Sequence, residues 1–397
     1  SGGSDSNPGT EGAPFKTIAH GSQKMSGGDT LYIRAGTYDE WMMGGYGGFV
    51  FQSGSPAAYT RYAAYPGEQV IVKPSSGQCV AWFSRHTAYI ELSGMTLDGT
   101  NTTSYVVKLD GSFTQDTFAH HIRLIGNEIR FGRMGIGGGR QSEFIGNRIH
   151  HMKAYGMYVG GGGNSLIEGN IIHDNDGYGL HLFEQHHPVN GWVVRNNIFY
   201  NNGGNYRPSY RGGALRPLPG LVLTRGKNEF YNNLVYNNPY GGVTVYGNGD
   251  NTLVANNTIY GNGNYGISVA DTIDNARIIN NISYGNRGAQ ITDNGVGTVL
   301  QNNLTTDPKF VNPAAGDFGI QAGSPAIDKG ITVAQVTTDF TGKARPEAAA
   351  YDIGAFEGAG SKADAMPDMS GGLPAGVGSG SGGSGGSGGG GLGSCYK

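Results

Sequence analysis

The segment NTIYGNGNYGISV, residues 257–269, decides the fold, because each of its halves recurs along the chain. The first half is an Asn followed within two residues by an apolar side chain. It occurs eight times at intervals of 20 to 36 residues, at Asn127, Asn147, Asn170, Asn197, Asn233, Asn257, Asn281 and Asn303. The second half, Gly-apolar-x-apolar, recurs at 156–159, 179–182, 242–245 and 266–269. Such periods indicate a repeat architecture.

Each repeat contains short segments in which apolar and polar residues alternate, separated by Asn and Gly turns. Alternation is typical of strands, and no helical period lies between them. A unit of about 22 residues cannot bury its apolar face alone, so the units must stack on one another. Connections between parallel strands are right-handed. The sequence therefore predicts an all-β fold, a right-handed parallel β-helix (β-solenoid), with an N-terminal helical cap and a Gly/Ser-rich C-terminal tail.

The eight repeated asparagines are predicted to be scaffold residues and not ligands. A residue at the same bend of every coil can take the left-handed conformation, and its amide can hydrogen-bond the Asn above and below. We therefore expect an Asn ladder along the axis. The break in the repeat between Thr100 and His121 predicts a loop.

Composition excludes several classes of protein. The chain has 397 residues, 73 of them Gly, and a formal net charge of −3, which argues against a nucleic-acid partner. No apolar run is long enough to span a membrane. Two cysteines cannot form a disulfide framework. The chain begins at Ser1, which suggests a processed or trimmed form, and we expect an extracellular or cell-surface location.

The organisation along the chain is predicted as four parts. Residues 1–40 form an N-terminal cap, in which 14–19 read as a short amphipathic helix with Pro14 near its first turn. Residues 41–310 form the coils and 311–357 a closing segment. Residues 358–397 are a Gly/Ser-rich tail ending near Cys395, which is the candidate for assembly through an intermolecular bond or an anchor.

Motifs near both ends resemble one protein family. The runs GSDSNPGT (3–10), PFKTI (14–18) and GDTLYI (28–33) resemble the start of bacterial secreted pectate-lyase-like β-helix proteins. The runs DPKF (307–310), GSPAID (323–328) and DIGAFE (352–357) resemble their closing segment. The resemblance implies the architecture but no single activity, because this fold carries lyases, hydrolases, epimerases, adhesins and inert scaffolds.

In pectate-lyase-like enzymes the chemistry lies on the outer face of one stacked sheet. If the Gly-apolar-x-apolar strands form that sheet, its outward column reads Tyr158, His181, Val222, Thr244 and Ser268. Cleavage of a uronic-acid polymer by β-elimination needs a cation to neutralise the carboxylate and a base to take the C5 proton. Arg225 is the candidate for the first role, and His181 or Tyr158 for the second.

The catalytic resemblance departs from the family in one coil. Residues 221–226 are similar to the arginine-bearing strand of alginate and chondroitin lyases, whose preceding coil carries an acidic pair and a lysine base. This chain has Glu184-Gln185-His186-His187 there. Calcium is expected only if the chain is a lyase, and Glu184 alone is a poor site, because calcium takes six to eight oxygens. Adjacent histidines, such as His150 and His151, point to opposite faces of a strand, so no metal site or other cofactor is predicted.

Aromatic and arginine side chains mark candidate sugar contacts. The widest interval of the repeat contains an insertion, 201–219, that suits either stacking on sugar rings or a plain surface loop. The candidate carbohydrate-binding residues are Tyr206, Arg207, Tyr210, Arg211, Tyr246 and Glu184.

Two functions remain open at this point. The favoured one is a secreted structural or adhesive protein that self-associates into an oligomer or filament, or attaches to a surface, through its caps and tail. The alternative is an extracellular enzyme, a lyase acting on an acidic polysaccharide in an outer-face groove.

Overall fold

The computed structural model describes residues 2–44, 48–112, 115–183, 190–207, 218–224, 227–247 and 249–360, with backbone alone at 221–224. Five residues named above as candidates therefore lie outside the described residues: Glu184, Tyr210, Arg211, Arg225 and Cys395. No helix within the described ranges is both long and apolar enough to cross a membrane.

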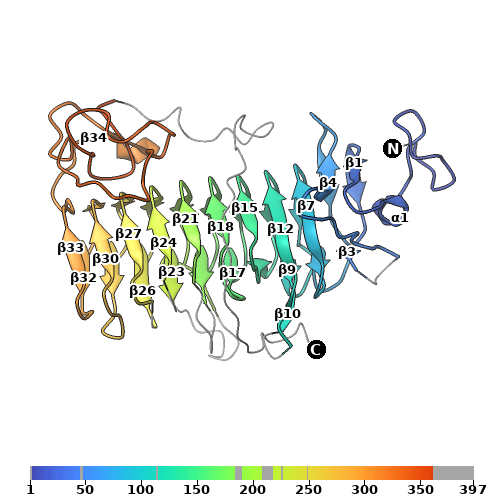
Figure 1. Ribbon diagram of the computed structural model, residues 1–397, viewed down its shortest axis with the longest axis horizontal. Coiled ribbons are helices and arrows are strands. Elements are labelled where there is room, and N and C mark those ends of the chain that lie inside the picture. Colours follow the sequence, from blue (N-terminus) through green and yellow to red (C-terminus); the bar gives the residue numbers. More distant parts are fainter. Residues whose placement is uncertain are drawn as a thin grey trace.

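Within these ranges the chain winds into coils that stack along one axis, and each full coil adds a strand to each of three parallel sheets (Figure 1). Sheet 1 contains β1 (Thr30–Ile33), β4 (Thr60–Ala64), β7 (Ala88–Ser93), β12 (His120–Ile125), β15 (Glu143–Ile145), β18 (Leu166–Glu168), β21 (Val193–Arg195), β24 (Glu229–Tyr231), β27 (Leu253–Ala255), β30 (Arg277–Ile279) and β33 (Val299–Gln301). Sheet 2 contains β2 (Gly36–Tyr38), β5 (Val70–Val72), β8 (Thr96–Asp98), β13 (Glu128–Arg130), β16 (Arg148–His150), β19 (Ile171–His173), β22 (Ile198–Tyr200), β25 (Leu234–Tyr236), β28 (Thr258–Tyr260) and β31 (Ile282–Tyr284). Sheet 3 contains β3 (Met42–Met43), β6 (Ala81–Phe83), β9 (Tyr105–Leu109), β14 (Met134–Gly137), β17 (Met157–Val159), β20 (Leu180–Leu182), β23 (Leu221–Thr224), β26 (Val243–Tyr246), β29 (Ile267–Val269) and β32 (Ile291–Asp293).

The β9 strand lies in the segment 100–121, where a loop was predicted, so the repeat continues through it. A small antiparallel hairpin follows, formed by β10 (Gly111–Ser112) and β11 (Thr117–Phe118).

The core consists of inward columns in register from coil to coil. In sheet 1 one such column runs from Leu31 through Tyr62 and on to Val254, Ile278 and Leu300. Its interior members are fully buried. Stacking places similar residues directly above one another. The apolar side chains that would be exposed in a single coil are therefore covered by those of the neighbouring coils.

The eight predicted asparagines form a hydrogen-bonded ladder at the bend between sheets 1 and 2. In a typical step the backbone N–H of Asn233 donates to Asn257 Oδ1 at 2.9 Å, and its Nδ2 donates to the same oxygen at 3.0 Å. The expected left-handed conformation is wrong for these residues. The residue before each of them has the positive φ, for example Asn232 (φ 54°) and Asn256 (φ 50°), and the ladder Asn follows it with its amide directed inward.

A second ladder, which the sequence analysis missed, lies at the bend between sheets 2 and 3. The backbone N–H of Asn202 donates to Asn238 Oδ1 at 2.9 Å, and that of Asn238 donates to Asn262 Oδ1 at 3.0 Å. Its members are Asn175, Asn202, Asn238, Asn262 and Asn286. Each lies five residues after a member of the first ladder, so the spacing was visible in the sequence.

The N-terminal end of the stack is covered by α1 (Ile18–Lys24), four residues later than the predicted start at Pro14. The later start of the helix has a local cause. The Asp5 carboxylate accepts from the backbone N–H groups of Lys16 and Thr17, and the Thr17 hydroxyl then caps the helix by accepting from His20 N at 3.1 Å. Strands β1 and β2 already belong to sheets 1 and 2, so the coils begin at Thr30, inside the segment predicted as cap.

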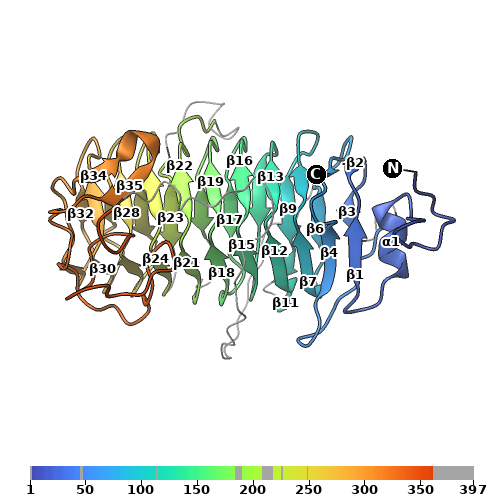
Figure 2. The same cartoon turned by 90° about the horizontal axis from the view of Figure 1, so that it is seen from above.

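The predicted closing segment lies beside the coils. Strands β34 (Phe310–Asn312) and β35 (Asp317–Ile320), joined by the 3-10 turn η2 (Pro313–Ala315), pack on outward side chains of sheet 2 such as Tyr236. Figures 1 and 2 show this segment above the last coils. A buried ion pair between Arg345 and Glu357 holds it together. Among residues up to 360, none of the described segments covers Leu300 of the last coil, which is 48% exposed.

Candidate functional site

The outward column predicted for sheet 3 is present. Tyr158 pairs in register with His181, His181 with Val222, Val222 with Thr244, and Thr244 with Ser268. Adjacent side chains in the column stand about 4.8 Å apart along the axis. One polymer lying along the axis could therefore contact several of them.

Five rings gather at the middle of this face, which we call the aromatic cluster: Tyr155, Tyr158, Tyr178, His181 and Phe183. The His181 ring lies at its centre, with ring centroids 5.2 Å from Tyr158, 4.7 Å from Tyr178 and 4.9 Å from Phe183. All five side chains are partly exposed. The cluster therefore presents flat apolar faces together with an imidazole and phenolic hydroxyls.

The other sugar-contact candidates differ in their surroundings. Tyr206 is 9% exposed and packs its ring 5.1 Å from that of Tyr155, so it supports the aromatic cluster from below and offers no open face. Arg207 is exposed beside it. Tyr246, at the end of β26, is 55% exposed. Of the candidates that the structure describes, Tyr246 thus has the most open ring for stacking.

Lys108 was missed because its segment was predicted as a loop. It lies on β9 in the same outward column, paired with Gly137, which pairs in turn with Tyr158. The residue is 3% exposed, and its ammonium lies 4.7 Å from the centre of the Tyr105 ring. No carboxylate among the described residues forms an ion pair with it. A buried, unneutralised ammonium is costly, which makes it a functional candidate.

The outer face of sheet 2 carries histidines of a different kind. His173 Nδ1 bonds Asp174 at 2.6 Å, and Arg148 Nε donates to His173 Nε2 at 3.0 Å. Its ring is stacked between those of His150 and Tyr200, at 4.9 and 4.8 Å. Burial lowers the pKa of His173 to about 4, despite the opposing effect of Asp174. Both ring nitrogens are therefore engaged in structural bonds.

A neighbouring ion-pair group on this face is also self-satisfied. Glu128 Oε1 lies 3.1 Å from His150 Nε2, and its other oxygen accepts from Arg130 and from Thr96. The hydrogen bond from His150, aided by the charge of Arg130, lowers the pKa of Glu128 to about 2. Each of these side chains thus has a protein partner within the coil stack.

The expected opposite orientation of adjacent histidines is wrong for two described pairs: His120 and His121, whose Nδ1 atoms lie 2.6 Å apart, and His150 and His151. His151 has φ 58° at the end of its strand, which turns its ring so that Nδ1 lies 2.7 Å from His150 Nδ1. Over the described ranges, no group of three or more His, Cys, Asp or Glu side chains is placed to hold a metal ion.

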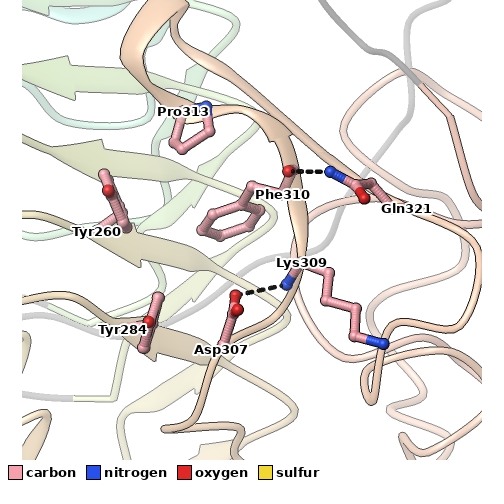
Figure 3. A pocket seen from close by; sticks show the side chains of 7 residues that line it. All are labelled: Tyr260, Tyr284, Asp307, Lys309, Phe310, Pro313 and Gln321. Carbon is pink, nitrogen blue, oxygen red and sulfur yellow. Dashed lines mark hydrogen bonds between the residues drawn. The ribbon is translucent and has the colours of Figure 1, made fainter.

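A small cavity of about 230 Å³ lies where the C-terminal segment meets sheet 2 (Figure 3). Tyr260 and Tyr284 form one wall, from adjacent coils. The polar groups on the other side already have protein partners. Lys309 Nζ donates to Gly323 O at 2.9 Å, and Gln321 Nε2 donates to Phe310 O at 2.7 Å. This cavity is a packing junction and a weaker candidate than the face of sheet 3.

Comparison with known proteins places the chain in a family. Residues 72–215 and 216–335 match the family described as the right handed beta helix region. The chain belongs to that family. This β-helix protein is similar to pectate lyase Pel9A, with 19% identity, a TM-score of 0.67 and coverage of 90% of this chain and 94% of that one. The pectate-lyase-like architecture expected from the sequence is thereby confirmed.

Two further relatives were found. The A-module of the mannuronan C-5 epimerase AlgE6 of Azotobacter vinelandii is 20% identical, with a TM-score of 0.54, over 70% of this chain and 80% of that module. The uncharacterized protein YwoF of Bacillus subtilis (strain 168) is 32% identical over 136 residues, which is 32% of this chain and 27% of YwoF. The chain thus matches about a quarter of the length of YwoF. At the identities of the two solved structures, the likeness concerns the fold.

Proposed function

We propose that this β-helix protein binds an acidic polysaccharide along the outer face of sheet 3 and cleaves it as a lyase, outside the cell. The observation that carries the proposal is the aromatic cluster, in which His181 is surrounded by partly exposed rings. Aromatic faces suit the apolar faces of sugar rings, and an imidazole suits proton transfer near neutral pH.

Charge supports an acidic polymer over a neutral one. Lys108 brings to this face a positive charge, and no carboxylate of the described residues forms an ion pair with it. Arg225, which follows β23 directly in the sequence, lies outside the described residues and keeps its proposed role of neutralising the reacting carboxylate. Cations on one face attract a polyanion and orient its carboxylates.

The proposed reaction is a β-elimination. Neutral His181 removes the C5 proton, the electron pair forms the C4–C5 double bond, and the C4–O bond to the next sugar breaks. The departing oxygen takes a proton from the Tyr158 hydroxyl, so the atoms and charges balance. The Tyr158 and His181 rings lie 5.2 Å apart, a separation that leaves both groups within reach of one sugar unit. No step is assigned to a bound cation.

The solved relatives favour this function over a structural role. The two solved structures described above are a pectate lyase and a mannuronan C-5 epimerase, and pectate and mannuronan are both acidic polymers. The structural or adhesive alternative is supported by one feature, the open last coil, which concerns association and is compatible with catalysis.

The test is incubation of the full-length protein with polygalacturonate, with alginate and, as a matched control, with a neutral glucan. We expect ultraviolet absorbance from an unsaturated uronate with an acidic polymer and none with the neutral one. Inversion at C5 without cleavage, detected by proton NMR, would show an epimerase instead. The proposal is refuted if the protein neither binds an acidic polymer nor forms a product from one.

A further inference from the structure

The two ends of the coil stack expose the same core column very differently. Leu31 and Leu300 are the first and last members of the inward column of sheet 1. Helix α1 covers Leu31 so closely that a Cβ on Gly21 would lie 2.9 Å from a Leu31 methyl group. Leu300, aligned with the fully buried Ile278, is 48% exposed. Within the part of the chain that the structure describes, this core column is therefore covered at its N-terminal end and left exposed at its C-terminal end.

The same end presents unpaired strand edges. Among the described residues, β33 pairs with β30 on one side only, and β32 pairs with β29 on one side only. Two further residues of this last coil have exposed apolar side chains: Val296 at 65% exposure, and Val299 at 43% on the outward side of β33, in register with Arg277. Exposed strands are normally protected by charges, prolines or a covering element. Strand β33, with the sequence Val-Leu-Gln, has none of these within its own three residues.

We infer that this end, defined by β32, β33 and Val296 and called the open end, is the interface of a two-fold dimer with a second copy of the chain. The occupant must offer unpaired strand edges and an apolar cross-section of matching size. A second copy supplies both through its own open end.

The covered opposite end decides the geometry. Head-to-tail stacking would require β1 to accept the open end, but α1 already packs over that side of the column. Two open ends can instead meet about a two-fold axis, with β33 of each copy pairing antiparallel to its symmetry mate. Such an interface is closed, so of the oligomer or filament expected from the sequence it would give an oligomer, the dimer.

The experiment measures the molar mass of the full-length protein by light scattering and sedimentation over a wide range of concentration. We expect a dimer that dissociates on dilution. Leu300→Lys should weaken association by at least about tenfold, because a buried ammonium at the interface lacks a partner. Tyr32→Lys, at an exposed outward side chain of β1 near the opposite, covered end, is the matched control and should leave the mass unchanged. Circular dichroism checks that each variant is folded.

Other outcomes contradict the inference. A monomer at every concentration would overturn it, as would growth into larger species or loss of association in Tyr32→Lys alone. Hydrogen exchange tests whether residues 361–397 of the same chain, and not a second copy, bind at the open end. Protection of the amides of 291–301 that is independent of concentration, in a protein of monomeric mass, would assign the open end to that segment. None of these results bears on lyase activity, so the two proposals fail separately.

Discussion

Sheets 2 and 3 place two histidines of one coil in opposite situations. His173, on the outer face of sheet 2, is buried, has both nitrogens bonded and is stacked between two rings. His181, eight residues later on sheet 3, is partly exposed among aromatic rings. The second Asn ladder forms the bend between the two faces, so one scaffold fixes both.

The difference shows how the same residue type can serve the scaffold or a ligand. On sheet 2 each imidazole has a charged neighbour at hydrogen-bond distance, as in the pair of His150 with Glu128. Those groups are satisfied before any ligand arrives, and burial makes protonation of His173 unfavourable near neutral pH. On sheet 3 the rings lie at stacking distances, and their exposed faces remain available to a ligand. We therefore assign stability to the first face and chemistry to the second.

The largest expected effect tests this assignment directly. His181→Ala should lower kcat of the proposed lyase by about 10²- to 10⁴-fold, the usual contribution of a general base. Its stability should change little, because the side chain is partly exposed. His173→Ala should do the reverse, with activity retained and a lower midpoint of urea unfolding, because Asp174 and Arg148 lose a buried partner. Initial rates and unfolding curves for both variants give the comparison.

Two outcomes would contradict the assignment of stability to sheet 2 and chemistry to sheet 3. Equal loss of activity in the two variants, with equal loss of stability, would mean that both histidines act through the fold. Retained activity in His181→Ala would remove the imidazole from the mechanism and leave Tyr158 as the candidate base.

Much of this arrangement could be predicted from the sequence, and the failures have physical causes. The column of Tyr158 and His181 was predictable, because alternation within a strand fixes which side chains point outward. Lys108 was missed because the repeat breaks around it, although β9 forms all the same. The pairing of His173 with Arg148 depends on which coil stacks on which, and no local pattern carries that information.

The C-terminal region shows the same limit. Its motifs resemble a closing segment, and nothing in them indicates whether the segment covers the end or the side of the stack. Phe318 and Ile320 become buried against Tyr236 and its neighbours only in three dimensions. The open end was therefore not predictable, although the Val-Leu-Gln strand that forms its edge is plain in the sequence.

A second, smaller effect should appear in the pH dependence of stability. Burial lowers the pKa of His173 from 6.5 to about 4. Between these values the unfolded chain binds a proton that the folded chain does not, so stability is complete above pH 6.5 and falls as the pH approaches 4. The loss is about 3 kcal/mol at 1.36 kcal/mol per pKa unit. Urea unfolding across this range should show the slope, and His173→Gln, which does not titrate, should lack it.

Glu128→Gln provides the control for that slope. The pKa of Glu128 is lowered from 4.5 to about 2, so its contribution is present above pH 4.5 and is lost only below that value. This variant should therefore change unfolding in the more acidic range and leave the slope between pH 6.5 and 4.5 intact. A slope that disappears in Glu128→Gln and persists in His173→Gln would reverse the roles of the two residues.

The smallest expected effect concerns the edge of the sheet 3 face. Tyr246 is 55% exposed at the end of β26, two coils beyond His181, so it would contact a sugar unit distant from the bond that breaks. Tyr246→Ala should raise KM about three- to tenfold and leave kcat unchanged, because a remote contact equally strong in ground and transition states affects binding alone. Tyr246→Phe keeps the ring and should restore most of the affinity. A fall in kcat in Tyr246→Ala would mean that this ring contacts the sugar unit that reacts. Unchanged kcat and KM would mean that the bound polymer does not reach β26 and that substrate binding is confined to the aromatic cluster.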